Sequence, residues 1–183
     1  MVAGLILALT LATASPARAE SLCDPAYQDC RSVLINYIRA ENVGIDVAFW
    51  FMTAARYKTE ILNRWASGVP VRILVDPRAD PLYSGNGDII AAFQQAGIPM
   101  RYRTAPGILH WKTMVFAGQN VVEFDGANYS PTAFVPQSPY SHYEDQSIYL
   151  PDDPSLAKPL TPAYHHPRLP PTHPTQFARL NTP

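Results

Sequence analysis

A histidine and a lysine stand two positions apart in the mostly apolar run 108–116. If this run forms a strand, side chains at i and i+2 point to the same face, so His110 and Lys112 are predicted to project together. Asn128 and Ser130 follow a turn at Gly126 and would add an amide and a hydroxyl. Because lysine is rarely buried and these groups all suit phosphate oxygens, the pattern predicts a phosphoryl-binding site.

The elements that must position these side chains alternate between strands and helices. Helices are expected over 31–39, 54–67 and 88–96, and strands over 45–51, 69–76, 98–103, 109–116, 121–125 and 145–150. Thr53 is expected to cap the second helix, and 118–120 is expected to form a hairpin turn. The predicted fold class is α/β, with a mixed sheet of βαβαβ plus hairpin strands flanked by helices.

The N-terminal 19 residues differ from the rest of the chain. An apolar stretch runs from Leu5 to Ala14, and Ala17-Arg18-Ala19 has the small-x-small pattern of a signal-peptidase site. This pattern predicts a signal peptide over 1–19 and a secreted or periplasmic protein. The alternative, an uncleaved membrane anchor, has an apolar run too short to span a bilayer comfortably.

The cysteines fit an exported protein, and the net charge restricts its binding partners. Cys23 and Cys30 follow the expected cleavage site, and two cysteines in an exported chain are expected to form a disulfide. With no third ligand nearby, they do not predict a zinc site. Loss of Arg18 changes the net charge from −1 to −2, which argues against tight non-specific binding of nucleic acid.

The C-terminal segment 151–183 holds nine of the 19 prolines and shows no apolar periodicity. We interpret it as a proline-rich, disordered tail after a domain that covers 20–150. The composition changes so abruptly that a truncation or a shifted reading frame near residues 156–159 is a second hypothesis.

The site motif resembles a known signature. His110-x-Lys112 and Gly126-Ala127-Asn128-Tyr129-Ser130 are similar to one copy of the HxK(x4)D…GSxN motif of the phospholipase D superfamily. The order of elements resembles the domain of the same superfamily over about residues 30–150. The resemblance implies cleavage of phosphodiesters in two steps, with no metal or other cofactor.

Each site residue then has an implied role. His110 would attack phosphorus, and a second histidine would protonate the leaving oxygen. Lys112 and Asn128 would stabilise charge on the non-bridging oxygens, with Ser130 as a further donor to the substrate. A carboxylate usually orients the nucleophile in this family, and Glu144 and Asp145 are the candidates.

The chain departs from the family pattern at three points. The aspartate expected seven residues after the histidine is Ala117, and the Gly-Ser pair before the asparagine is Asp125-Gly126. In addition, one extra residue lies between Lys112 and Asn128. Active members use two motifs, whereas this chain shows one. His142 lacks a lysine two positions later, and His165 and His166 lie in the proline-rich segment.

Two explanations account for the single motif. A two-fold homodimer would bring two copies of His110 and Lys112 face to face. Alternatively, a second half-domain was lost by truncation, in which case the isolated chain would be inactive.

The sequence therefore leaves three functions open. One is an exported phosphodiesterase that acts on phospholipid head groups or other phosphodiesters. Another is a dimeric endonuclease on the same scaffold, which the negative net charge disfavours. The last is an inactive remnant.

Overall fold

The computed structural model describes residues 20–82, 85–104, 106–136 and 147–151. The predicted signal peptide, most of the proline-rich segment, His142, Glu144 and Asp145 lie outside these residues. No helix in the described ranges is both long and apolar enough to cross a membrane.

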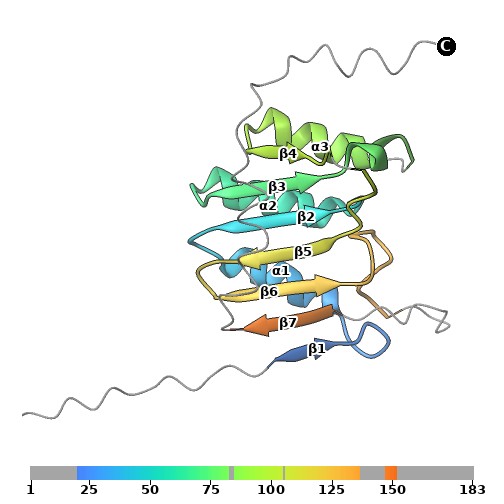
Figure 1. The fold of residues 1–183 in the computed structure, drawn as a ribbon. Helices are drawn as coiled ribbons and strands as arrows, with labels where there is room; N and C mark the ends of the chain where they lie inside the picture. Colours follow the sequence, from blue (N-terminus) through green and yellow to red (C-terminus); the bar gives the residue numbers. More distant parts are fainter. Residues whose placement is uncertain (1–19, 83–84, 105, 137–146, 152–183) are drawn as a thin grey trace, which may run out of the picture.

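In the part of the chain that the structure describes, seven strands form one mixed sheet, in the order β1-β7-β6-β5-β2-β3-β4 (Figure 1). The strands are β1 Ser21–Cys23, β2 Ile45–Phe49, β3 Val71–Val75, β4 Met100–Tyr102, β5 Lys112–Phe116, β6 Val121–Asp125 and β7 Ser147–Pro151. β2, β3 and β4 are parallel, and the pairs that involve β5, β6, β7 and β1 are antiparallel. This is the mixed α/β sheet that the sequence predicted.

The helices are α1 Cys30–Ala40, α2 Ala55–Ala66 and α3 Asn86–Gln95, with a short 3-10 helix, η1, over Pro77–Leu82. Leu34, Ile61 and Phe93, one from each α-helix, share the main core with sheet residues such as Val47 and Met114. The helices therefore cover one face of the sheet (Figure 1). On the alternate positions of the strands a smaller buried cluster forms, comprising Ala48, Leu74, Leu109, Val115 and Val122.

The helix boundaries follow local sequence signals except at one predicted cap. The side chain of Asp29 caps α1 by accepting the backbone N–H of Ser32 at 3.0 Å. Gly68 follows α2 with a φ of 88°, a conformation that glycine adopts without strain. Thr53 does not cap α2, because the cap position is Ala54, which makes no side-chain cap bond. The backbone of Tyr129 defines this helix start instead, by accepting the N–H groups of Thr53 and Ala54 at 3.0 Å each.

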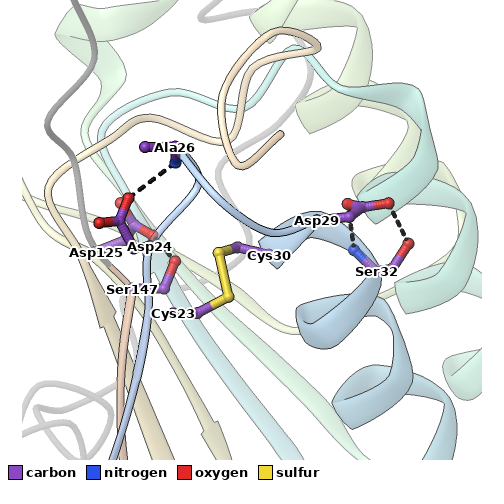
Figure 2. Close-up of a disulfide and its surroundings, with 8 residues drawn as sticks. All are labelled: Cys23, Asp24, Ala26, Asp29, Cys30, Ser32, Asp125 and Ser147. Atoms are coloured by element: carbon purple, nitrogen blue, oxygen red, sulfur yellow. Dashed lines mark hydrogen bonds between the residues drawn. A yellow bond between two sulfur atoms is a disulfide. The ribbon is translucent and has the colours of Figure 1, made fainter. Parts of the chain in front are cut away.

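Two further features complete the fold. The sequence did not predict β1, a three-residue strand that pairs with β7 at the edge of the sheet. The predicted disulfide is present: Cys23 ends β1 and Cys30 begins α1, with Cα atoms 5.7 Å apart (Figure 2). The disulfide thus links the edge of the sheet to the helical layer.

Candidate active site

The site lies where β2 and β3 end and β5 begins. Lys112 is the first residue of β5 and pairs with Phe49, the last residue of β2. His110 precedes the strand, so the predicted strand over 109–116 starts too early. One more bond, from the N–H of Trp50 to the carbonyl of Trp111 at 2.8 Å, extends the pairing beyond the strand. The carboxyl ends of parallel strands are a common location for ligand sites in α/β folds.

His110 and Lys112 lie in direct contact. The Nζ atom of Lys112 lies 2.9 Å from Nδ1 and 3.1 Å from Nε2 of the His110 ring. Lys112 is only 4% exposed, whereas His110 is open to solvent. The indole of Trp50 flanks the imidazole, with the ring centroids 6.0 Å apart. The predicted convergence of the two side chains is therefore present in the structure.

The surroundings of His110 favour the neutral form of its imidazole. Partial burial lowers the pKa of His110, and the positive charge of Lys112 lowers it further. A neutral imidazole has a free lone pair on one ring nitrogen, which a nucleophile requires. The ammonium beside it supplies a positive charge that could hold an anionic oxygen.

Asn128 and Ser130 lie on a loop that returns to the same end of the sheet. The Oδ1 atom of Asp125 accepts the N–H of Ala127 at 2.6 Å where β6 ends. Tyr129 then forms a parallel bridge with Met52, just beyond the end of β2. Asn128 is half-buried, and its Oδ1 atom has no hydrogen-bond partner among the described residues. The backbone of the loop thus lies at the end of the sheet where β5 begins.

The buried carboxyl of Glu123 supports this loop, a contact that the sequence did not predict. The hydroxyl of Tyr129 donates to Oε2 of Glu123, on β6, at 2.9 Å, and both side chains are fully buried. Burial raises the pKa of Glu123 well above its usual value, and the nearby charge of Asp125 adds to the effect. The sequence did contain a sign of this residue, because Glu123 stands between apolar neighbours in a predicted strand.

Two more carboxylates, those of Asp76 and Glu41, bind the backbone on either side of β5, and the sequence did not predict these contacts. Asp76, the first residue after β3, accepts the N–H of Leu109, next to His110, at 2.7 Å. Glu41, at the end of α1, accepts the N–H groups of Gly118 at 2.8 Å and Gln119 at 3.2 Å in the β5–β6 turn. Ala117 occupies the position where the family motif has its aspartate, so a carboxylate from another element binds this turn.

The structure does not test Glu144 or Asp145, which lie outside the described residues. Within the described ranges, no group of three or more histidine, cysteine, aspartate or glutamate side chains could hold a metal ion.

A comparison with known families decides the classification. The family described as "Cardiolipin synthase, PLD-like domain" matches residues 34–158, more than half of the chain. The chain belongs to this family. It is a member of the phospholipase D superfamily, as the His-x-Lys and Asn motifs predicted. No curated protein matches the sequence.

Three of the similar solved structures illustrate how far the fold is shared. Nuc from Salmonella typhimurium, a phospholipase D family member, has a TM-score of 0.67 at 17% identity and covers 80% of this chain and 91% of its own. NucT from Helicobacter pylori has a TM-score of 0.62 at 19% identity, with 80% and 92% covered. Phosphatidylserine synthase from Haemophilus influenzae has a TM-score of 0.59 at 12% identity, with 88% and 45% covered. At these identities the likeness establishes the fold alone.

Proposed function

We propose that this protein is an exported phosphodiesterase of the phospholipase D type, with His110 as its nucleophile. The observation that carries the proposal is the contact between the imidazole of His110 and the buried side chain of Lys112. Membership of the superfamily and the half-buried amide of Asn128 support it. The disulfide is compatible with an extracellular or periplasmic location.

The reaction has two displacements at phosphorus. In the first, a ring nitrogen of His110 bonds to phosphorus and the ester P–O bond breaks, while a second histidine gives its proton to the leaving oxygen. In the second, water attacks phosphorus and the P–N bond breaks, while the water proton passes to the second histidine. Lys112, Asn128 and Ser130 bind the non-bridging oxygens, and Glu144 or Asp145 orients His110.

The second histidine comes from another copy of the same chain. A two-fold homodimer places two equivalent sites face to face, so each His110 serves as acid for the other. Mixing tests this arrangement. If wild-type and His110→Ala chains are mixed and allowed to exchange subunits, activity should fall below the wild-type fraction, because mixed dimers hold only one histidine. Activity that stays proportional to that fraction would contradict the dimeric site.

Phospholipid head groups are the substrate class that we favour over DNA. The net charge of −1 falls to −2 without the predicted signal, and few positive charges are then available to neutralise a nucleic-acid backbone. A dimeric endonuclease is the second candidate, and an inactive remnant is the third.

Parallel assays separate the three candidates. Choline release from phosphatidylcholine vesicles and nicking of supercoiled plasmid are measured with wild-type protein and with His110→Ala. We expect choline release that the substitution abolishes, together with an acid-labile phosphohistidine detectable by ³¹P NMR. Nicking alone would support the endonuclease, and activity that survives the substitution would remove His110 from the mechanism. No activity in either assay, with folded protein, would support the remnant.

A further inference from the structure

The backbone immediately before His110 is held by a buried carboxylate. Asp76 is fully buried and follows β3 directly, at the same end of the sheet as the candidate site. Its Oδ2 atom accepts the N–H of Leu109 at 2.7 Å. Leu109 is itself only 2% exposed, so water does not compete for this bond.

An arginine extends the contact to a second point on the same segment. Arg78 donates from Nε to Oδ1 of Asp76 at 2.7 Å, and its second guanidinium nitrogen binds both Oδ2 of Asp76 and the carbonyl of Gly107. The backbone N–H of Arg78 also donates to Oδ1 of Asp76, at 3.0 Å. Arg78 and Asp76 therefore fix the main chain at Gly107 and at Leu109.

The surroundings of Asp76 favour its charged form. Burial by itself raises the pKa of Asp76, but the Arg78 side chain and the backbone N–H groups of Leu109 and Arg78 outweigh it and hold the pKa below its usual value. The pair with Arg78 thus stays ionised at neutral pH, and hydrogen bonds to a charged group are the stronger kind.

His110 and Trp111, which follow Leu109, are held by other contacts. The carbonyl of Trp111 accepts the N–H of Trp50, and the ring of His110 meets the ammonium of Lys112. His110 is solvent-exposed, and its ring has the indole of Trp50 on one side. Whether the imidazole meets Trp50 and Lys112 depends on where the main chain on its two sides places it.

We propose that Asp76, together with Arg78, is the positioning residue for the nucleophilic His110. It acts through the backbone of Leu109 and does not touch the substrate. The inference rests on the proposed function only for its effect on turnover, because the placement of the ring beside Lys112 can be measured in a protein without activity.

A second aspartate–arginine pair in the same sheet provides a matched control. Asp46, on β2, accepts Nε of Arg72, on β3, at 2.6 Å, and the two residues are direct neighbours across the strands. Its side chain is largely buried, like that of Asp76. The pair has the same chemistry, but it joins two strands and does not hold the segment that contains His110.

The experiment compares Asp76→Asn with Asp46→Asn. Asparagine keeps a carbonyl oxygen for the N–H of Leu109 but loses the charge that binds Arg78. For Asp76→Asn we expect kcat to fall about 100-fold with KM within about twofold, since a displacement of about 1 Å can cost that much. The His110 imidazole, followed by ¹H–¹³C NMR, should titrate at a higher pH because it lies farther from Lys112. Asp46→Asn should leave both readouts unchanged.

Equal effects of the two substitutions on kcat and on the His110 titration would overturn the proposal. If Asp76→Asn does not fold, Arg78→Gln is used instead: it keeps the bond to Leu109, releases Gly107 and should give a smaller change in the same direction. An unchanged titration in that variant would also overturn the proposal. If the wild-type protein hydrolyses no phosphodiester, the proposed function fails, and the NMR titration still tests the positioning role.

Discussion

Glu41, which binds the β5–β6 turn, and Glu123, which lies on β6, are both fully buried, yet their pKa values shift in opposite directions. At the turn, one oxygen of Glu41 accepts four backbone N–H groups, from Asn42, Val43, Gly44 and Gly118, at 2.7–3.1 Å. Within β6, Glu123 accepts the hydroxyl of Tyr129, and its Oε1 atom has no partner among the described residues.

The difference in donors explains the difference in pKa. Burial raises the pKa of both carboxyls, because it disfavours the charged form. For Glu41 the N–H groups of Val43, Gly44 and Gly118 outweigh burial, and the pKa lies below its usual value. For Glu123 the charge of Asp125 adds to burial, and the bond from Tyr129 does not compensate. The surroundings of Glu41 at the turn therefore favour its charged form, and those of Glu123 below the loop that carries Asn128 favour its neutral form.

The largest expected effect is the loss of the anion at the turn. Glu41→Ala would remove a buried, charged acceptor that four backbone N–H groups share, and we expect the free energy of unfolding at pH 7 to fall by about 3–5 kcal/mol. Urea denaturation measures this. Glu41→Gln, which keeps one acceptor oxygen, should lose less. A loss below about 1 kcal/mol in the alanine variant would show that the turn does not depend on this carboxylate.

The pH dependence of the Glu41 effect has a definite sign. Because its pKa is lowered from 4.5 in the folded state, its stabilisation is present above pH 4.5 and is lost as the pH falls through the folded value. The difference in stability between the wild type and Glu41→Gln should therefore narrow in acid. A difference that widens below pH 4.5 would contradict the assignment of an ionised Glu41.

Glu123→Gln should give the opposite trend and a smaller effect. The folded pKa is raised above 4.5, so the unfolded state ionises first and wild-type stability falls as the pH rises above that value. Glutamine has no such loss and keeps an acceptor for the hydroxyl of Tyr129. We expect the variant to be more stable by about 1–2 kcal/mol at pH 8, with little difference at pH 4. Thermal unfolding across this range tests the prediction, and a gain confined to acid would contradict it.

Asp125→Asn should sharpen the comparison by removing one cause of the raised pKa. With the negative charge gone, the pKa of Glu123 should fall but stay above its usual value, since burial remains. The ¹³C chemical shift of the Glu123 carboxyl reports the titration directly. Asp24→Asn is a suitable control, because Asp24 accepts the N–H of Ala26 (Figure 2), just as Asp125 accepts the N–H of Ala127. Equal shifts in the two variants would remove Asp125 as a specific cause.

The same contrast explains how much the sequence could predict. The alternation of strands and helices, the hairpin turn and the His110–Lys112 pair depend on residues close together in the chain, and the structure contains all of them. Glu41 meets Gly118 across 77 positions, and no local pattern links the two. β1 has three residues and depends on its pairing with β7, so neither its length nor its composition indicated a strand.

The site was predictable in part for a similar reason. His110 and Lys112 were found by their spacing, but the start of β5 at Lys112 was not, because residues 107–109 are bound by Asp76 and Arg78 outside the strand pairing. Asp76 had a visible signal, since it is a carboxylate at the end of an apolar strand. The structure contains the contact between His110 and Lys112, but the roles of all the site residues stay predictions, namely those of His110, Lys112, Asn128, Ser130, Glu144 and Asp145.

Lys112 is a third buried ionisable residue at the hairpin, and its removal gives the smallest expected effect. Burial is the larger cause of the lowered pKa of His110 and the charge of Lys112 the smaller, so Lys112→Met should raise that pKa only part of the way to 6.5. Methionine keeps the length and most of the volume of the side chain. NMR titration of His110 measures the change, with Lys58→Met on α2 as the control. An unchanged His110 titration would mean that the ammonium of Lys112 does not lie against the imidazole in solution. The start of β5 would then lack a cation that acts on the site, and Glu41 at the β5–β6 turn would be the remaining buried group at the hairpin with a charged form favoured by its surroundings.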